Sequence, residues 1–171
     1  TMIVSQFLLL VGISLVLRLA SRSGWRDFWW RWAQVAAAAA LVSAGSWLMF
    51  GPRFIYAGIL HFIAIALVVG RVLAPLRELN FALAAGAFAA WLLLRDPAYN
   101  DFPAHLLGLV TAKPRTEDYV PLFPWIAVVL LGLGLGSLWQ RRGFALAPAL
   151  QRLNARPPRL LVLLGTWALT V

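Results

Sequence analysis

Long apolar runs without a charged side chain dominate the sequence, and they constrain its fold more than any other feature. A helix needs roughly 17–25 mostly apolar residues to cross the hydrocarbon core of a bilayer, which is about 30 Å thick. Hydrophobic residues make up 62% of the 171 residues and charged residues 12%, whereas soluble domains average about 25% charged residues. We therefore expect lipid, and not water, to surround much of the chain.

The runs predict five complete spans and a truncated sixth. The expected complete spans are residues 2–17, 33–50, 54–70, 81–94 and 120–139, and the truncated one is 160–171. The run 81–94 is short, and we extend it backward to Pro75 because proline suits the first turn of a helix. The expected fold is an all-α polytopic transmembrane helix bundle. It forms a single transmembrane domain over residues 1–171, which we expect to be part of a longer membrane protein.

The positive charges predict the orientation of these spans. Eleven arginines fall in the connections after the first, third and fifth spans, and four Lys or Arg residues fall in the others. Cytoplasmic connections carry an excess of Lys and Arg, so the connection 95–119 is expected outside. Tryptophans lie near both expected membrane surfaces, as in other spanning helices. We expect the segments 25–32 and 144–153 to lie flat on the cytoplasmic surface, where arginines contact anionic lipid headgroups.

The same placement of charge argues for a lipid bilayer as partner and against nucleic acid, although the net charge is +9. The sequence has no cysteine and no phosphate-binding loop, dinucleotide fingerprint, HExxH or GxSxG motif. No metal site is expected. Gly132 and Gly136 have the small-xxx-small spacing that lets helices approach closely. This face predicts tight packing, and a homo-oligomer through it is a second interpretation.

His61 is the sharpest candidate for chemistry because it interrupts an apolar run, in YAGILHFIAIA. Ionisable groups at membrane depth usually face a polar cavity or a partner, and imidazole can accept or donate a proton near neutral pH. The alternative is a neutral histidine bonded to a carbonyl or hydroxyl of a neighbouring helix.

The connection 95–119 is the second candidate region, because connections beyond about 12–15 residues often carry function. Its segment 102–110 is apolar around His105 and is expected to dip into the membrane or cap the bundle. Glu117 and Asp118 are candidates for orienting an acceptor or a histidine, and Thr116 for capping a turn. Arg53 lies on the same side and is expected to pair with Asp118 or bind an anion.

Three stretches resemble one family: GISLVLRLASR, SWLMFGPRFIYAGILHFIAIALVVG and AKPRTEDYVPLFPWIAVVLLGLGLG. Together they are similar to bacterial members of the heparan-alpha-glucosaminide N-acetyltransferase catalytic-domain family, most specifically in GILHF and TEDYVPLFPW. The resemblance implies a multi-span membrane acyltransferase in the bacterial cytoplasmic membrane. Family members usually begin with an Arg-Gly pair followed by an externally facing histidine, and this segment has no match among the 171 residues.

The resemblance implies acetyl-CoA or another acyl-CoA as donor and an extracytoplasmic sugar amine or hydroxyl as acceptor. On this interpretation His61 and Asp118 are the catalytic candidates, and Arg71 and Arg77 bind the phosphates of the donor. The candidates for gripping the acceptor are His105, Glu117, Tyr119, Arg53 and Trp125. The alternative class is a transporter or a scaffold subunit without enzymatic activity.

Overall fold

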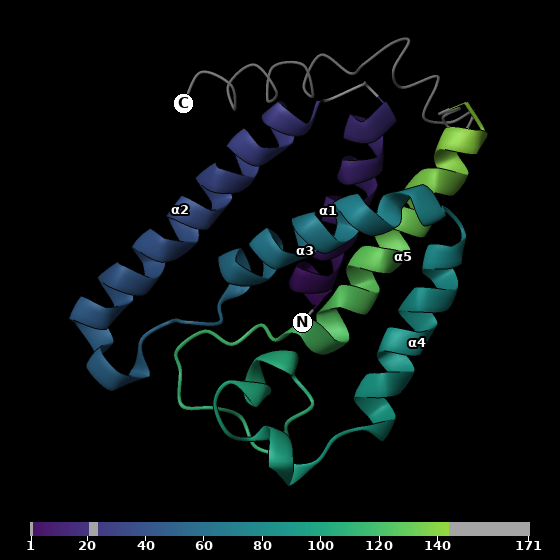
Figure 1. The fold of residues 1–171 in the computed structure, drawn as a ribbon. Helices are drawn as coiled ribbons and strands as arrows, with labels where there is room; N and C mark the ends of the chain where they lie inside the picture. The colour runs from purple at the N-terminus through teal and green to yellow at the C-terminus, as the bar shows by residue number, and fades with distance from the viewer. Residues whose placement is uncertain (1, 21–23, 144–171) are drawn as a thin grey trace, which may run out of the picture. The chain divides into compact units, whose positions relative to one another are not determined.

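A computed structural model describes residues 2–20 and 24–143 (Figure 1). The chain divides into two units, of which the first ends at Gln140. Of the second unit, the structure describes only Arg141 to Gly143, so the sixth span at 160–171 and the segment 144–153 lie outside the described residues. The described part is an all-α polytopic bundle, as predicted.

Five α-helices form this bundle, joined by short 3₁₀ turns. The α-helices are α1 (Met2–Ala20), α2 (Trp25–Phe50), α3 (Ile59–Leu73), α4 (Leu79–Leu93) and α5 (Leu122–Arg141), and the 3₁₀ turns are η1 (Gly51–Arg53), η2 (Ala74–Leu76), η3 (Pro97–Tyr99) and η4 (Ala104–Leu107). Within the described residues, four stretches are long and apolar enough to cross a membrane: Met2–Ala20, Trp25–Arg53, Ile59–Leu76 and Leu122–Arg141. Helix α4 is shorter and spans about 22 Å at 1.5 Å per residue.

The core lies where α1, α3 and α5 meet (Figure 1). Its fully buried side chains include Leu8 from α1, Ala66 from α3 and Leu133 from α5. Helix α2 packs against α3, and α4 places the ring of Phe81 against Gly134 of α5. Many large apolar side chains on α2 stay exposed, among them Leu41, Leu48 and Met49, which suits a surface that faces lipid.

Three boundaries differ from those expected. Helix α2 begins at Trp25, so the segment expected to lie flat forms its first turns. No glycine or proline interrupts residues 25–44, and the indole of Trp32 donates a 2.9 Å hydrogen bond to the carbonyl of Ala64 on α3. The span expected from residue 54 starts as a helix only at Ile59.

The predicted backward extension of α4 to Pro75 is wrong. Pro75 lies in η2, which continues directly from α3, and α4 begins at Leu79. The chain turns at Arg77, whose φ is 50°. Fully buried Asn80 holds this turn, because its amide donates to the carbonyls of Leu73 and Arg77 at 3.0 and 2.9 Å.

The predicted small-residue face of α5 packs against α1 of the same chain. A side-chain Cβ at Gly132 would lie 2.3 Å from the carbonyl oxygen of Leu9, and one at Gly136 would lie 3.0 Å from Cβ of Val16. Both glycines of α5 therefore contact α1. A second copy of the chain would have to displace α1 to use this face.

Candidate functional site

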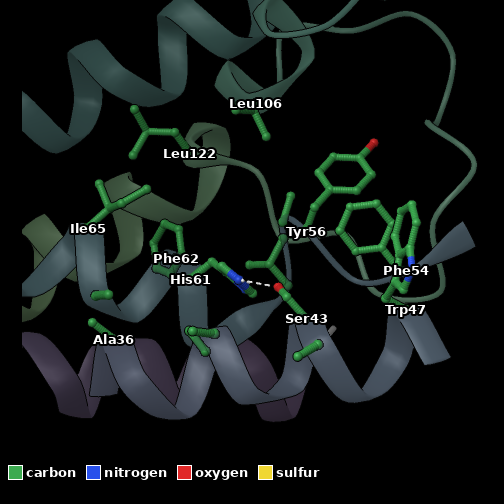
Figure 2. Close-up of a pocket in the computed structure, with 16 residues that line it drawn as sticks. Ala36, Ser43, Trp47, Phe54, Tyr56, His61, Phe62, Ile65, Leu106 and Leu122 are labelled. Carbon is green, nitrogen blue, oxygen red and sulfur yellow. Dashed lines mark hydrogen bonds between the residues drawn. The ribbon is translucent and has the colours of Figure 1, made fainter. Parts of the chain in front are cut away.

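A cavity of about 760 Å³ lies between α2 and α3 and contains the membrane-embedded histidine (Figure 2). No charged side chain lines it among the described residues. The sixteen lining residues are Ala36, Ala39, Ala40, Ser43, Ala44, Trp47, Phe54, Tyr56, Ala57, His61, Phe62, Ala64, Ile65, Leu106, Val120 and Leu122. Six of the lining residues are alanines, whose small methyl side chains fill little of the space between the helices.

His61 lies in the first turn of α3, and its ring points toward α2 (Figure 2). Its Nε2 lies 2.9 Å from the hydroxyl oxygen of Ser43. The structure thus matches the alternative interpretation, in which the histidine is bonded to a hydroxyl of a neighbouring helix. The other ring nitrogen, Nδ1, is buried and has no hydrogen-bond partner among the described residues.

An extended segment before α3 determines where His61 lies. Residues 54–58 run beside the end of the connection 95–119, with a parallel bridge between Ala57 and Tyr119. The amide of Val120 donates to the carbonyl of Ala57 at 2.8 Å, and that of Glu117 donates to the carbonyl of Arg53 at 3.3 Å. This pairing is the physical reason why α3 begins at residue 59 and not at 54.

Asp118 caps α3 from a distance of 59 residues in sequence. Its Oδ2 accepts a 2.9 Å hydrogen bond from the amide of Ile59, one of the donors that a helix start leaves unpaired. Gly58 makes the approach possible, because a Cβ there would lie 2.6 Å from the same carboxylate oxygen. The structure therefore places Asp118 on the turn that carries His61.

Thr116 holds the same segment in place. Its buried hydroxyl lies 2.8 Å from the carbonyl of Phe54 and 3.3 Å from that of Asp118. Arg53 pairs with Glu117 at 3.4 Å, with both side chains exposed. The expected partner of Arg53 was Asp118, but Asp118 faces the helix start instead.

His105 lies in η4 and is 5% exposed. The rings of Tyr56, Phe102 and Tyr119 surround it at centroid distances of 5.4, 5.6 and 6.5 Å. The hydroxyl of Tyr119 donates to the carbonyl of His105, and Leu106 lines the cavity. Leu106 is thus the residue through which the apolar segment 102–110 contributes to the wall of the cavity.

Both tyrosines beside His105 stay protonated well above neutral pH. Burial raises the pKa of Tyr119 to about 12, and the nearby Tyr56 contributes to that shift. Burial also raises the pKa of Tyr56. At physiological pH both phenols therefore keep their protons, and that of Tyr119 is donated to the carbonyl of His105.

Arg71 and Arg77 lie away from this cavity but line one of their own, of about 320 Å³. The guanidinium of Arg71 lies 4.5 Å from the ring centroid of Trp25, within cation–π range. Arg71 also lines a neighbouring cavity with Arg18 and Arg31. The two cavities share Arg71 and are lined by four arginines in all, namely Arg18, Arg31, Arg71 and Arg77. They lie at the end of the bundle predicted to be cytoplasmic.

The structure brings some predicted residues together and separates others. Asp118 and Tyr119 lie on the segment that flanks the cavity, whereas Trp125 packs against the core. Sequence reasoning missed Ser43 and Tyr56, which both line the cavity. Ser43 and Ser46 are the two hydroxyl side chains in the expected span 33–50, and hydroxyls in so apolar a run are the signal that would have found Ser43.

A comparison with known families matches the whole chain, residues 1–171, to the catalytic domain described as "Heparan-alpha-glucosaminide N-acetyltransferase, catalytic". The chain belongs to this N-acetyltransferase family. No curated protein and no solved structure matches it. Membership places the chain in a family of membrane acetyltransferases and, in general terms, implies an acyl-CoA donor. No group of metal-ligating side chains occurs among the described residues.

Proposed function

We propose that the protein is a membrane acyltransferase of the bacterial cytoplasmic membrane. It transfers an acetyl or longer acyl group from acyl-CoA to an amine or hydroxyl of an extracytoplasmic sugar. The observation that carries this proposal is His61, which lines an uncharged cavity and is oriented by Ser43. Histidine is the side chain that most often serves as a general base, and a membrane-embedded ionisable residue usually has a function.

The arginine-lined cavities fit the donor. Acyl-CoA carries phosphates, for which guanidinium groups are suitable partners, and Arg71 and Arg77 line one cavity. When bound, acyl-CoA supplies an acyl group activated as a thioester. His61 and Arg71 lie on the same helix, about 15 Å apart along its axis at 1.5 Å per residue. A donor held by its phosphates at Arg71 therefore needs a long arm to bring its acyl group to His61, and CoA has such an arm.

The acceptor is proposed to approach from the connection 95–119. Glu117, Tyr119 and His105 belong to this connection, and aromatic and acidic side chains suit a sugar. In the reaction the acceptor nitrogen or oxygen attacks the thioester carbonyl while His61 takes the proton that the acceptor loses. The acyl C–S bond breaks, and the CoA sulfur leaves as a thiol after it receives that proton from His61. Asp118 fixes the turn on which His61 lies. The family's description names a glucosaminide as the acceptor of its characterised activity, and glucosamine is therefore our first acceptor to test.

The experiment measures transfer of labelled acetyl groups from acetyl-CoA to glucosamine by the full-length protein in proteoliposomes. We expect His61→Ala to lower the rate by about 100-fold or more, the usual contribution of a general base. Asp118→Ala should lower it less, and Asp118→Asn should retain most of the rate because an amide oxygen can still accept from Ile59. Ala37→Ser is the matched control, since Ala37 is exposed on α2 outside the cavity.

Unchanged rates in both His61→Ala and Asp118→Ala would remove these assignments. Thermal stabilisation that saturates with acetyl-CoA would support the enzyme. Stabilisation by a transported solute, with none by acetyl-CoA, would favour the transporter or scaffold alternative.

A further inference from the structure

Ser43 takes part in two hydrogen bonds with a hydroxyl that has one proton. Its oxygen lies 2.8 Å from the carbonyl oxygen of Ile55 and 2.9 Å from Nε2 of His61. A carbonyl only accepts, whereas a neutral imidazole nitrogen donates or accepts according to the tautomer. If the hydroxyl donates to Ile55, both contacts are satisfied only when Nε2 of His61 carries the ring proton. If it donates to Nε2 instead, no proton lies between the Ser43 oxygen and the carbonyl oxygen of Ile55, although these two oxygens are 2.8 Å apart.

From this count we infer that Ser43 is a positioning residue, which holds His61 as the Nε2–H tautomer and leaves Nδ1 as its basic nitrogen. The inference deepens the proposed function, since it rests on His61 acting as the base. Nδ1 has no partner among the described residues. In this tautomer Nδ1 is a lone-pair acceptor, the state that a general base requires.

The carbonyl that fixes the hydroxyl proton is itself held in place. The amide of Ile55 donates a 2.9 Å hydrogen bond to the hydroxyl of Ser46, which is 6% exposed. Ser43 and Ser46 lie on the same side of α2, and both bind the backbone of Ile55. Of these two serines, Ser43 alone also contacts His61. Ser46→Ala is therefore a control that disturbs the same segment without touching the ring.

The test uses nitrogen-15 NMR of the full-length protein labelled at histidine, in detergent micelles at a pH where His61 is neutral. This sequence has two histidines, and His105→Gln assigns their signals. We expect Nε2 of His61 to show the shift of a protonated ring nitrogen and Nδ1 that of a bare one. Ser43→Ala should convert this pattern into a mixture of tautomers, whereas Ser43→Thr should keep it. Ser46→Ala loosens the support of the Ile55 carbonyl but leaves the Ser43–His61 contact in place, so it should change the pattern less than Ser43→Ala does. A spectrum of the unsubstituted protein with the proton on Nδ1 would overturn the inference. This result does not require the serine variants to fold.

Acetyl transfer to glucosamine gives the second readout. Ser43→Ala should lower kcat by about 10–100-fold, part of what a general base contributes, with KM for acetyl-CoA little changed. Ser43→Thr should restore most of the rate. If His61→Ala abolishes transfer but Ser43→Ala changes neither kcat nor the nitrogen shifts, the positioning role is overturned and the proposed function stands. If the tautomer changes as expected but no variant alters transfer, the proposed function fails and the positioning role stands.

Discussion

At the scale of single residues, the site depends on polar groups that find partners in largely apolar surroundings. Leaving a buried donor or acceptor unpaired costs about 1–3 kcal/mol, so each satisfied contact selects one local arrangement. The hydroxyl of Tyr119 reaches the carbonyl of His105, and Asp118 reaches the amide of Ile59. The first contact closes the connection 95–119 on itself, and the second ties that connection to the start of α3.

The raised pKa of Tyr119 predicts how stability depends on alkaline pH. An unfolded tyrosine loses its proton near pH 10, whereas folding raises the pKa of Tyr119 to about 12. Between these values the unfolded chain binds fewer protons than the folded one, so the free energy of unfolding falls as pH rises. We expect Tyr119→Phe to weaken this dependence. Below about pH 10 the variant should also have a free energy of unfolding lower by about 1 kcal/mol, because it lacks the hydrogen bond to the carbonyl of His105.

Unfolding in detergent at several pH values between 8 and 12 measures both effects. A tyrosinate absorbance titration of the folded protein checks their cause. In that titration, Tyr119→Phe should remove an absorbance step near pH 12. If it removes a step near pH 10 instead, burial does not raise the pKa of Tyr119.

At the scale of elements, close backbone contact decides which helices pack together. In lipid, helices associate through van der Waals packing and hydrogen bonds, because lipid tails are as apolar as leucine. Gly12 on α1 and Gly132 on α5 lie so close that a Cβ on either would fall 2.3 Å from a backbone oxygen of the other helix. The glycine pattern of α5 therefore specifies its neighbour within the chain.

We expect Gly132→Ala to destabilise the bundle by about 1–3 kcal/mol, the usual cost of overpacking. A methyl group at this position meets the backbone of Leu9, which cannot move aside as a flexible side chain does. Gly86→Ala on α4 is the matched control, since a Cβ there has nothing within 4 Å. It should be neutral or slightly stabilising, because alanine favours helix over glycine. Thermal unfolding in detergent compares the two, and equal effects would contradict the close α1–α5 contact.

At the scale of the whole molecule, the distribution of charge assigns the two ends of the bundle to different compartments. Arginines are concentrated in residues 18–32, in residues 71–80 and at the end of α5. The connection 95–119 contains three Lys or Arg residues but also four of the six acidic residues. On the positive-inside rule we expect the arginine-lined cavities to face the cytoplasm and the connection 95–119 to face the opposite side, where the proposed acceptor would bind. The arm of a donor bound at Arg71 then has to reach about 15 Å along α3 to bring its acyl group to His61.

Labelling of single cysteines tests this orientation, and the sequence contains no cysteine to interfere. Asp101 and Arg142 are both exposed and lie in the connection and at the end of α5, respectively. In intact cells, a membrane-impermeant maleimide should label Asp101→Cys but should label Arg142→Cys only after permeabilisation. The reverse pattern would place the proposed donor and acceptor sides on the wrong faces.

The long apolar runs were enough to predict an all-α membrane bundle and the approximate positions of its helices, because a bilayer accepts only long apolar helices or closed barrels. It also singled out His61, since an ionisable group in an apolar run is visible without any structure. The tertiary structure alone decided what surrounds that histidine. Ser43 lies 18 residues before it and Asp118 caps its helix from 59 residues away. Hydrogen-bond partners over such separations are chosen by packing, so no local pattern predicts them. For the same reason no local pattern predicts the late start of α3, which follows from the pairing of residues 54–58 with the end of the connection 95–119.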